Sequence, residues 1–218
     1  MRPAELRSLL REVRRGEMTP ALAARRIAEA PLEQLEGAAL DHQRALRTGF
    51  PEVVFGLGKT PAQMVAIVGR LYARHGLVLA TRVDAAAQAA LAAEFPRAQV
   101  HERARCVVLR RRAERPRGRV LVLCAGTADL PVAEEALLTA RVLGSRAELV
   151  ADVGVAGLHR LLVHRSSLRS ARVLVVVAGL EGALPSVVGG LTDRPVIAVP
   201  TSVGYGAHFH GLAPLLAM

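Results

Sequence analysis

Acidic and polar residues that could carry chemistry collect in the second half of the chain, after short apolar runs. Glu181 lies in a turn between two glycines, where no helix cap is needed, so its carboxylate is the stronger functional candidate. Asp129 precedes Pro131 at an expected helix start, where a cap is the ordinary role. Asp152 and His159 share a further loop, although a lone histidine at a helix start is usually structural. These four residues are the candidates for proton transfer or for holding substrate hydroxyl groups.

The apolar runs before these residues predict where a ligand would bind. Ligands of open α/β sheets bind outside the carboxyl ends of the strands, commonly between the first and third strands. The segments that follow those two strands are "CAGTADLPVAEEA" and "AGLEGALPSVVGG". A later loop, "PTSVGYGAHFHGL", adds Ser202, Gly204 and Tyr205. We therefore expect a binding crevice at this edge of the sheet.

Metal hydrolase and esterase chemistry find little support. No H-E-x-x-H motif occurs, and His159 and His164 are five residues apart, on different faces of a helix. His208 and His210 would need a third ligand to hold a metal ion. A G-x-S-x-G nucleophile turn is also absent.

The segment "VVFGLGKTPAQ", residues 53–63, resembles half of a phosphate-binding loop and holds Lys59, the only lysine of the chain. A Walker loop would need glycine where Val53 stands, and the dinucleotide fingerprint would need glycine in place of Pro61. What remains is a glycine turn into a helix, which Thr60 and Gln63 can cap reciprocally. This segment is either an anion site at a helix start or a capped helix with an exposed lysine.

Helix and strand patterns divide the chain into two parts. The first 48 residues are expected to form helices, with Thr19 as a cap before Pro20. A small β-α-β-α-β unit follows, from "EVVF" to "CVVLR", with Gly76 ending one helix and Asp84 capping the next. The basic segment "RRRAERPRGR", residues 110–119, contains Pro and Gly and indicates a boundary. We therefore predict domains at residues 1–115 and 116–218.

The second domain shows the pattern of a parallel sheet. "RVLVLCAG", "RVLVVVAG" and "PVIAVP" are nearly continuous apolar runs, typical of strands buried on both faces. An amphipathic helix, "PVAEEALLTARVLG", stands between the first two runs. The expected fold class is α/β: a helical arm, a small α/β unit, and then a doubly wound parallel sheet.

Composition narrows the classes of partner. The net charge of +10 falls entirely in residues 1–119, but the four Phe and two Tyr are not interleaved with the arginines, so no nucleic acid is expected. No apolar run is long enough to span a bilayer and the N-terminus is not typical of a signal peptide, so no membrane and a cytoplasmic location are expected. Cys106 and Cys124 are expected to be reduced thiols.

Four segments of the second domain closely resemble LarB, the pyridinium carboxylase family of nickel-pincer nucleotide biosynthesis. They are "AGTADLPVAEEA", "DVGVAGLHRLL", "VVVAGLEGALPSVVGG" and "VPTSVGYGAHFHGLAPLLAM". The first half resembles the same family through "DHQRALRTGFPEVVFG", "GKTPAQ" and "LATR". The family usually has Gly-Glu-Gly before the lysine, whereas this chain has Gly56-Leu57-Gly58, so a carboxylate is missing there.

The resemblance implies a flavodoxin-like domain, similar to aminoimidazole ribonucleotide carboxylases, in a homo-oligomer. It implies nicotinic acid adenine dinucleotide as substrate, carboxylated at C5 of the pyridinium with carbon dioxide or bicarbonate as co-substrate. Cleavage of the phosphoanhydride would then release AMP. No tightly bound cofactor is implied, although Mg²⁺ is possible.

The resemblance also suggests roles for individual residues. Glu181 would remove the ring proton after carboxylation, with His159 as a less favoured partner and Asp152 beside Asp129 orienting hydroxyls or a metal ion. Thr127 and nearby loop amides would hold phosphate or ribose oxygens. The full set of expected substrate-binding residues is Gly126, Thr127, Asp129, Gly154, Gly182, Pro185, Ser202, Gly204, Tyr205, Lys59, Thr81 and Arg82.

The family's nucleophile is a cysteine thiolate that adds to the ring and makes a ring carbon nucleophilic. In the family this cysteine follows the "GLAPLLAM" segment by a few residues, and this sequence ends at Met218. Neither Cys106 nor Cys124 matches its position, so we expect a truncated chain that is inactive on its own. Two alternatives stay open: a ribonucleotide carboxylase of purine synthesis, which needs no thiol, and a non-catalytic dinucleotide-binding module.

Overall fold

The computed structural model describes residues 3–28, 32–111 and 115–218 and begins with a helical hairpin. Helices α1 (Pro3–Arg14) and α2 (Pro20–Ala28) share a small apolar core around Leu9, Met18 and Ala23. The Thr19 hydroxyl accepts a hydrogen bond from the Leu22 amide at 3.2 Å, as expected of a cap. The predicted helices are therefore confirmed within residues 3–28.

The expectation of helices as far as residue 48 is wrong for residues 33–40. Strands β1 (Glu33–Leu35) and β2 (Ala38–Leu40) form an antiparallel hairpin, and only the five-residue helix α3 (Arg44–Thr48) follows. The two-residue turn contains Gly37 at φ 73°, a conformation that glycine adopts at no steric cost. The Glu36-Gly37 pair is thus a hairpin signal within an otherwise alanine-rich and leucine-rich segment.

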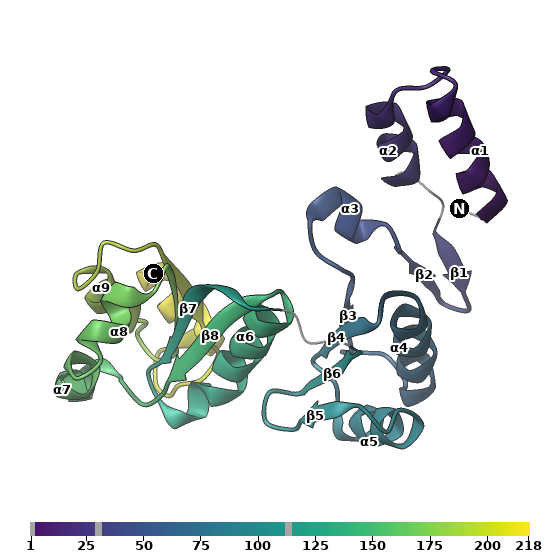
Figure 1. Cartoon of the computed structure of the whole chain (residues 1–218). Helices are drawn as coiled ribbons and strands as arrows, with labels where there is room; N and C mark the ends of the chain where they lie inside the picture. The colour runs from purple at the N-terminus through teal and green to yellow at the C-terminus, as the bar shows by residue number, and fades with distance from the viewer. Residues whose placement is uncertain (1–2, 29–31, 112–114) are drawn as a thin grey trace.

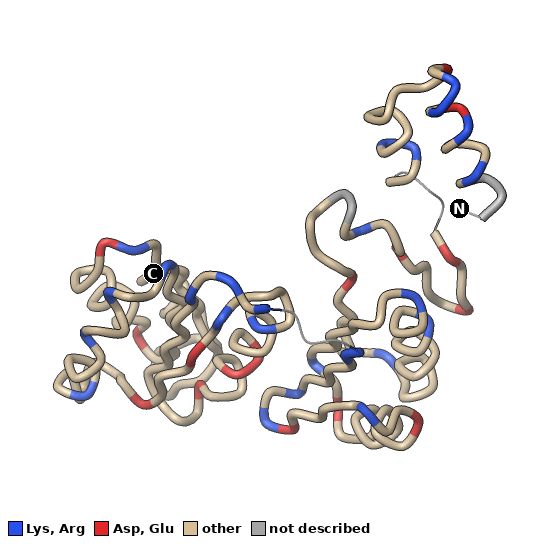
Figure 2. Tube along the Cα trace, viewed as in Figure 1, with Lys and Arg blue, Asp and Glu red and all other residues tan. Residues whose placement is uncertain are grey.

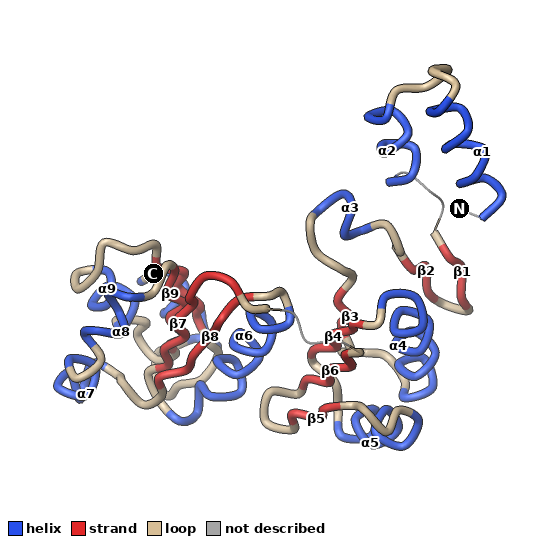
Figure 3. Tube along the Cα trace, in the orientation of Figure 1, coloured by secondary structure: helices blue, strands red, loops and turns tan. Residues whose placement is uncertain are grey.

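The first sheet has the strand order β3-β4-β6-β5 (Figure 3). Strands β3 and β4 are parallel, whereas β6 runs antiparallel to both β4 and β5. The predicted β-α-β-α-β unit missed β5, a three-residue edge strand. The elements are β3 (Val53–Phe55), α4 (Pro61–His75), β4 (Leu77–Thr81), α5 (Ala85–Glu94), β5 (Gln99–His101) and β6 (Cys106–Arg110).

Helices α4 and α5 cover one face of this sheet. Met64, Val68 and Leu71 of α4 and Leu91 of α5 pack against the buried side chains of the strands. The predicted helix ends are confirmed: Thr60 and Gln63 form a capping box, Gly76 ends α4 at φ 70°, and the Asp84 carboxylate accepts from the Ala87 amide.

The second sheet is fully parallel, with the order β10-β9-β7-β8. Helix α6 packs on one face of this sheet, and α7, α8 and α9 pack on the other (Figure 1). This is the expected doubly wound α/β domain. Its elements are β7 (Arg117–Cys124), α6 (Leu130–Val142), β8 (Ser145–Val150), α7 (Leu158–Leu162), α8 (Arg165–Ser170), β9 (Val173–Ala178), α9 (Leu184–Gly189), β10 (Val196–Pro200) and α10 (Leu212–Ala217).

Helix α6 also joins the two sheets. Its Val142 lies in an apolar cluster with Leu79, Cys106 and Val108, which belong to the uncovered face of the first sheet. Glu135 of α6 pairs with Arg82 at 3.0 Å. The predicted boundary segment contains residues 112–114, which lie outside the described residues, so the boundary stays a prediction.

Within the described ranges, no helix combines the length and the apolar character needed to cross a lipid bilayer. The expected cytoplasmic location stays a prediction.

Candidate functional site

A cavity of about 400 Å³ lies at the carboxyl ends of β7 and β9, the two central strands of the parallel sheet. This is the point where the chain order reverses, because β8 lies on one side of β7 and β9 on the other. The cavity thus occupies the expected crevice. Its lining comes from four loops and comprises Ala125, Gly126, Ala128, Asp129, Gly154, Val155, Ala156, Arg160, Ala178, Gly179, Leu180, Glu181, Ala183, Leu184, Val203 and Tyr205.

Asp129 is a buried carboxylate of this cavity, with a residue exposure of only 4%. Its Oδ2 accepts a hydrogen bond from the Gly126 amide at 3.1 Å, and its Oδ1 accepts one from the Thr201 hydroxyl at 2.7 Å. Both carboxylate oxygens are therefore occupied by the protein. The carboxylate joins the loop after β7 to the loop after β10.

Backbone segments approach one another closely around the cavity, and glycines make this possible. A Cβ atom on Gly154 would lie 2.9 Å from the Ala125 carbonyl oxygen, and one on Gly179 would lie 2.1 Å from the Val203 oxygen. The Gly154 amide donates to Ala125 and the Leu180 amide donates to Val203, both at 2.9 Å. Any side chain at either glycine would separate these loops.

Two non-glycine residues next to the cavity adopt left-handed backbone conformations. Asp152, after β8, has φ 58°, and Leu180, after β9, has φ 51°. Such conformations cost free energy for ordinary residues and are concentrated at functional sites. The loops are therefore held in their shape by the surrounding contacts.

Glu181 lines the cavity with an exposed carboxylate. None of the described residues forms a hydrogen bond or an ion pair with it. This distinguishes it from Asp129, whose oxygens are occupied, and leaves Glu181 able to accept a proton from a bound molecule.

Asp152 does not line the cavity but forms an ion pair with Arg160, which does. The guanidinium of Arg160 folds over Gly157, where a Cβ atom would clash with it. Sequence reasoning missed Arg160. The available signal was an arginine three residues after Gly157, next to the candidate His159.

The structure brings together only some of the expected site residues. Gly126, Asp129, Gly154, Glu181 and Tyr205 line the cavity. The side chains of Thr127, His159 and Ser202 are exposed outside this lining. Three others have packing roles: Gly182 lies against Pro214, Gly204 lies against the His208 ring, and Pro185 is buried in the first turn of α9.

Lys59, Thr81 and Arg82 are not part of this cavity either. The Lys59 ammonium donates to the Phe55 carbonyl at 2.7 Å, so it closes its own loop. Thr81 is buried, and Arg82 pairs with Glu135. Lys59 lines a different cavity of about 870 Å³ between the β1–β2 hairpin and α4. The geometry therefore favours the capped helix over the anion site for this loop.

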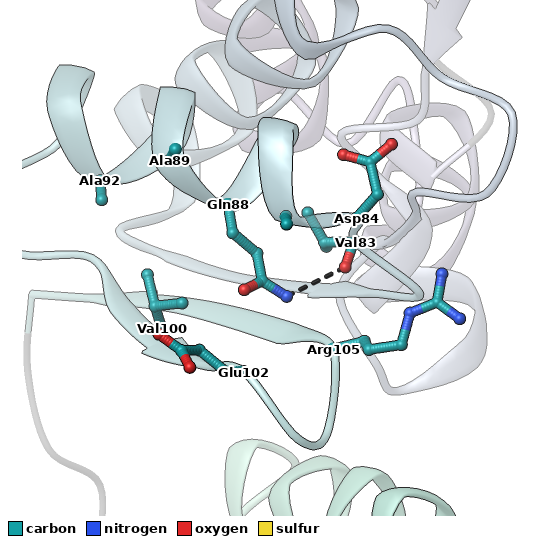
Figure 4. Close-up of a pocket in the computed structure, with 9 residues that line it drawn as sticks. Val83, Asp84, Gln88, Ala89, Ala92, Val100, Glu102 and Arg105 are labelled. Atoms are coloured by element: carbon teal, nitrogen blue, oxygen red, sulfur yellow. Dashed lines mark hydrogen bonds between the residues drawn. The ribbon is translucent and has the colours of Figure 1, made fainter.

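A further cavity, of about 780 Å³, lies between α5 and the β5–β6 turn. Figure 4 shows the buried Gln88 reaching from α5 to the Val83 carbonyl, to which it donates a hydrogen bond at 3.0 Å. Ala89 and Ala92 form the apolar wall on the same helix. The lining combines this helix face with the β5–β6 turn and also includes the charged residues Asp84, Glu102 and Arg105.

Neither cysteine is placed for nucleophilic chemistry. Cys106 and Cys124 are free and buried, and burial raises the pKa of Cys106 to about 12. Burial is also the main cause of the raised pKa of Cys124. A protonated buried thiol is a poor nucleophile.

No cluster of three potential metal ligands among His, Cys, Asp and Glu occurs within residues 3–28, 32–111 and 115–218. The His208 and His210 rings face each other edge-on, with centroids 5.8 Å apart. The expectation that Asp129 or Asp152 binds Mg²⁺ stays a prediction.

Comparison with known proteins identifies the family of the chain. Residues 32–112 match the family model described as LarB/PurE-like N-terminal domain, and residues 119–218 match AIR carboxylase. The uncharacterised protein MJ0165 of Methanocaldococcus jannaschii is 35% identical over 225 residues, which covers 98% of this chain and 86% of that protein. The chain therefore belongs to the LarB-like family. The cavity with Glu181 and Arg160 lies wholly within the AIR carboxylase part of this LarB-like chain.

A second relative is similar to the second domain alone. The N5-carboxyaminoimidazole ribonucleotide mutase of the same organism is 37% identical over 101 residues, 45% of the LarB-like chain. The chain spans 59% of the length of that mutase. The family match thus connects the strand-end cavity to carboxylases and their mutase relatives.

Proposed function

We propose that this LarB-like chain carries the binding and proton-transfer site of a pyridinium carboxylase. The substrate would be nicotinic acid adenine dinucleotide, carboxylated at C5 of the pyridinium ring and then cleaved at its phosphoanhydride to release AMP. The observation that carries the proposal is Glu181, a carboxylate without a partner among the described residues. It shares the strand-end cavity of an AIR carboxylase domain with the cation of Arg160.

Carboxylation of an electron-poor ring needs a nucleophile first. A thiolate adds to the pyridinium, and the resulting enamine carbon at C5 forms a bond to carbon dioxide. C5 then carries both the new carboxylate and its original hydrogen. Removal of this proton, followed by loss of the thiolate, restores the aromatic ring. We assign the proton removal to Glu181.

Arg160 supplies the positive charge for the anionic substrate in this proposal. Its guanidinium can bind a phosphate or carboxylate through two parallel hydrogen bonds. Asp152 orients that guanidinium through their ion pair. Asp129 acts differently, because its two hydrogen bonds make it a support for the loops and not a free base.

The thiolate is not assigned to either cysteine of residues 1–218. Cys106 and Cys124 are buried strand residues with raised pKa values. The proposal therefore predicts that residues 1–218 bind the dinucleotide without carboxylating it. A protein that also includes the family's cysteine is expected to perform the whole reaction.

The proposal includes a homo-oligomer. Tyr205, which lines the cavity, is 82% exposed, and Phe209, Leu212 and Leu216 nearby in the chain are also exposed. Apolar surface of this kind is typical of an interface between subunits. Light scattering of the full chain checks this part, and a monomer at micromolar concentration would contradict it.

The experiment is mass spectrometry of the dinucleotide incubated with labelled bicarbonate. The chain is compared with a version extended through the expected cysteine. Label in a pyridine mononucleotide with the extended chain alone supports the proposal. In that background Glu181→Gln should lower the rate at least about 100-fold. The control Glu94→Gln removes an exposed carboxylate on α5 and should leave the rate unchanged.

A second candidate is the purine-synthesis reaction, favoured by the similarity of the second domain to the mutase. Conversion of the aminoimidazole ribonucleotide substrate by residues 1–218, without any thiol, would support it against the pyridinium carboxylase. Saturable dinucleotide binding with no label in either chain would instead identify a binding module.

A further inference from the structure

Another cavity, of about 350 Å³, lies at the junction between the two domains. It is far from the strand-end cavity along the fold, because its residues stand at the amino ends of β7 and β8. Its lining comes from the end of β6, the residue before β7, the last turn of α6 and the start of β8. These residues are Arg110, Pro116, Arg141, Gly144, Ser145, Arg146 and Ala147.

Three arginines line this junction cavity, and none of the described residues that line it is acidic. Arg110 Nη2 donates to the Arg141 carbonyl at 3.4 Å, and Arg141 Nε donates to the Ala147 carbonyl at 3.0 Å. For Arg146 no partner occurs within the part of the chain that the structure describes. Carbonyl groups are neutral, so no described acidic side chain neutralises the three positive charges of the cavity.

Other arginines at the same domain junction form ion pairs with acidic side chains. Arg82 and Arg103, from the first domain, each pair with a glutamate of α6, namely Glu135 and Glu134. Charges there are neutralised by side chains. In the backbone trace of Figure 2, arginine positions (blue) lie in the described residues on either side of the segment between the two sheets.

Capping of α6 explains part of this arrangement. Arginines stabilise the carboxyl end of a helix because its last carbonyls carry partial negative charge. Arg110 and Arg141 both lie at that end of α6. Capping does not account for Arg146, which belongs to β8 and donates to no carbonyl of the described residues.

We propose that the junction cavity binds a phosphate-type oxyanion. Guanidinium groups match the oxygens of phosphate with paired, charge-assisted hydrogen bonds, and several arginines can share one phosphate group. The Ser145 hydroxyl adds a donor from the same wall. The cavity has room for more than one phosphate group, so pyrophosphate or the phosphates of a nucleotide are expected to bind better than inorganic phosphate.

Binding at this place would link the domains. Arg110 ends the last strand of the first domain, whereas Arg141 and Arg146 belong to the second. An anion held by all three arginines therefore bridges both sheets. Such a ligand stabilises the folded chain because it binds the native state and not the unfolded state.

The test is calorimetric titration of the full chain with inorganic phosphate and with pyrophosphate at low ionic strength. Arg146→Gln and Arg110→Gln should each weaken pyrophosphate binding about tenfold or more, the usual effect of losing a charge-assisted hydrogen bond. Arg97→Gln, an exposed arginine on the first domain, removes one charge elsewhere and should change the affinity less than about twofold. Arg160→Gln, in the strand-end cavity, should leave this binding intact.

Three results would overturn the proposal: no saturable binding to the wild-type chain, equal weakening by Arg97→Gln, or loss of binding in Arg160→Gln alone. Arg146→Gln carries the test if Arg110→Gln alters the fold, which thermal melting reports, because Arg146 is exposed and unpartnered among the described residues. ADP titrated into Arg160→Gln identifies the source of the phosphate. Tighter binding than pyrophosphate indicates a nucleotide, equal binding indicates free pyrophosphate, and either supports the site. The outcome is independent of the proposed carboxylase.

Discussion

The Thr201 hydroxyl donates a hydrogen bond to Asp129 Oδ1 at 2.7 Å, between residues 72 positions apart in the chain. Both residues are 4% exposed, so neither can exchange this contact for water without opening the loops. The bond fixes the loop after β10 against the start of α6 and so shapes one side of the strand-end cavity.

Replacing Thr201 by valine keeps the shape of the side chain and removes the donor. A buried carboxylate oxygen is then left without a partner, and the free energy of unfolding is expected to fall by about 1–3 kcal/mol. Urea denaturation followed by circular dichroism measures this. Thr201→Ser keeps the hydroxyl and should be closer to the wild type. Equal stability of Thr201→Val and wild type would show that the hydrogen bond contributes nothing.

Lys59→Ala is expected to leave the affinity for nicotinic acid adenine dinucleotide unchanged within about twofold. The reason is that the Lys59 ammonium is bound to the Phe55 carbonyl and lines a different cavity from Glu181. Arg160→Gln is the matched loss of a positive charge, and it should weaken binding about tenfold or more. A comparable loss of affinity in Lys59→Ala would contradict this prediction and support the contact between Lys59 and the substrate that the sequence suggested.

Acidification is expected to loosen the β1–β2 hairpin from α4. Glu33 accepts from His42 at 2.6 Å, and the other nitrogen of His42 lies 3.0 Å from His75 Nε2. Burial, and then the charges of His42 and Arg74, lower the pKa of His75 below 6.5, while the charge of Glu52 opposes this. The hydrogen bond from His42 is the main cause of the lowered pKa of Glu33.

The direction of the pH effect follows from these two shifts. A lowered folded pKa means that the unfolded chain binds more protons, so stability rises with pH. The contribution of His75 is complete above pH 6.5 and is lost as pH falls below it; that of Glu33 is lost below pH 4.5. The effect is small because His75 is exposed and Glu33 is only half-buried.

The melting temperature of His75→Ala against wild type, measured from pH 5 to pH 8, checks this account. The difference between the two should be largest at pH 8 and should shrink toward pH 5. His164→Ala, outside this cluster, serves as the control. A difference that grows on acidification would mean that the His42–His75 contact is stabilised by protonation.

Both thiols are expected to be unreactive in the folded chain. Cys106 and Cys124 are buried in β6 and β7 with raised pKa values, so little thiolate forms at pH 8. A chromogenic disulfide reagent should find no fast-reacting thiol in the native protein and two after denaturation. One rapidly labelled native thiol, mapped to Cys106 or Cys124, would reopen the question of an internal nucleophile.

Much of the second domain could be predicted because its signals are local. Strands such as "RVLVVVAG" are apolar on both faces, and only a parallel sheet covered by helices buries both. The order of the strands then placed the loops containing Asp129 and Glu181 at one edge. Helix caps such as Thr60 and Asp84 were predictable for the same reason, since each acts within one turn.

The missed features depend on contacts between distant residues or on very short elements. The β1–β2 hairpin has three residues in each strand. This is too few to show the alternation of apolar and polar residues that indicates a strand, and the neighbouring alanines favour a helix. The bond from Thr201 to Asp129 and the pair of Arg82 with Glu135 arise only when the domains are folded. Arg160 reached the cavity because Gly157 leaves room for its side chain.

The central claim is that the strand-end cavity of the second domain binds the dinucleotide. Hydrogen–deuterium exchange of residues 1–218, with and without saturating nicotinic acid adenine dinucleotide, locates the bound molecule directly. The account predicts slower exchange in peptides covering residues 125–129, 152–160, 179–184 and 203–205, with residues 56–63 unchanged. Protection confined to residues 56–63, or none at the four loops despite saturable binding, would contradict it.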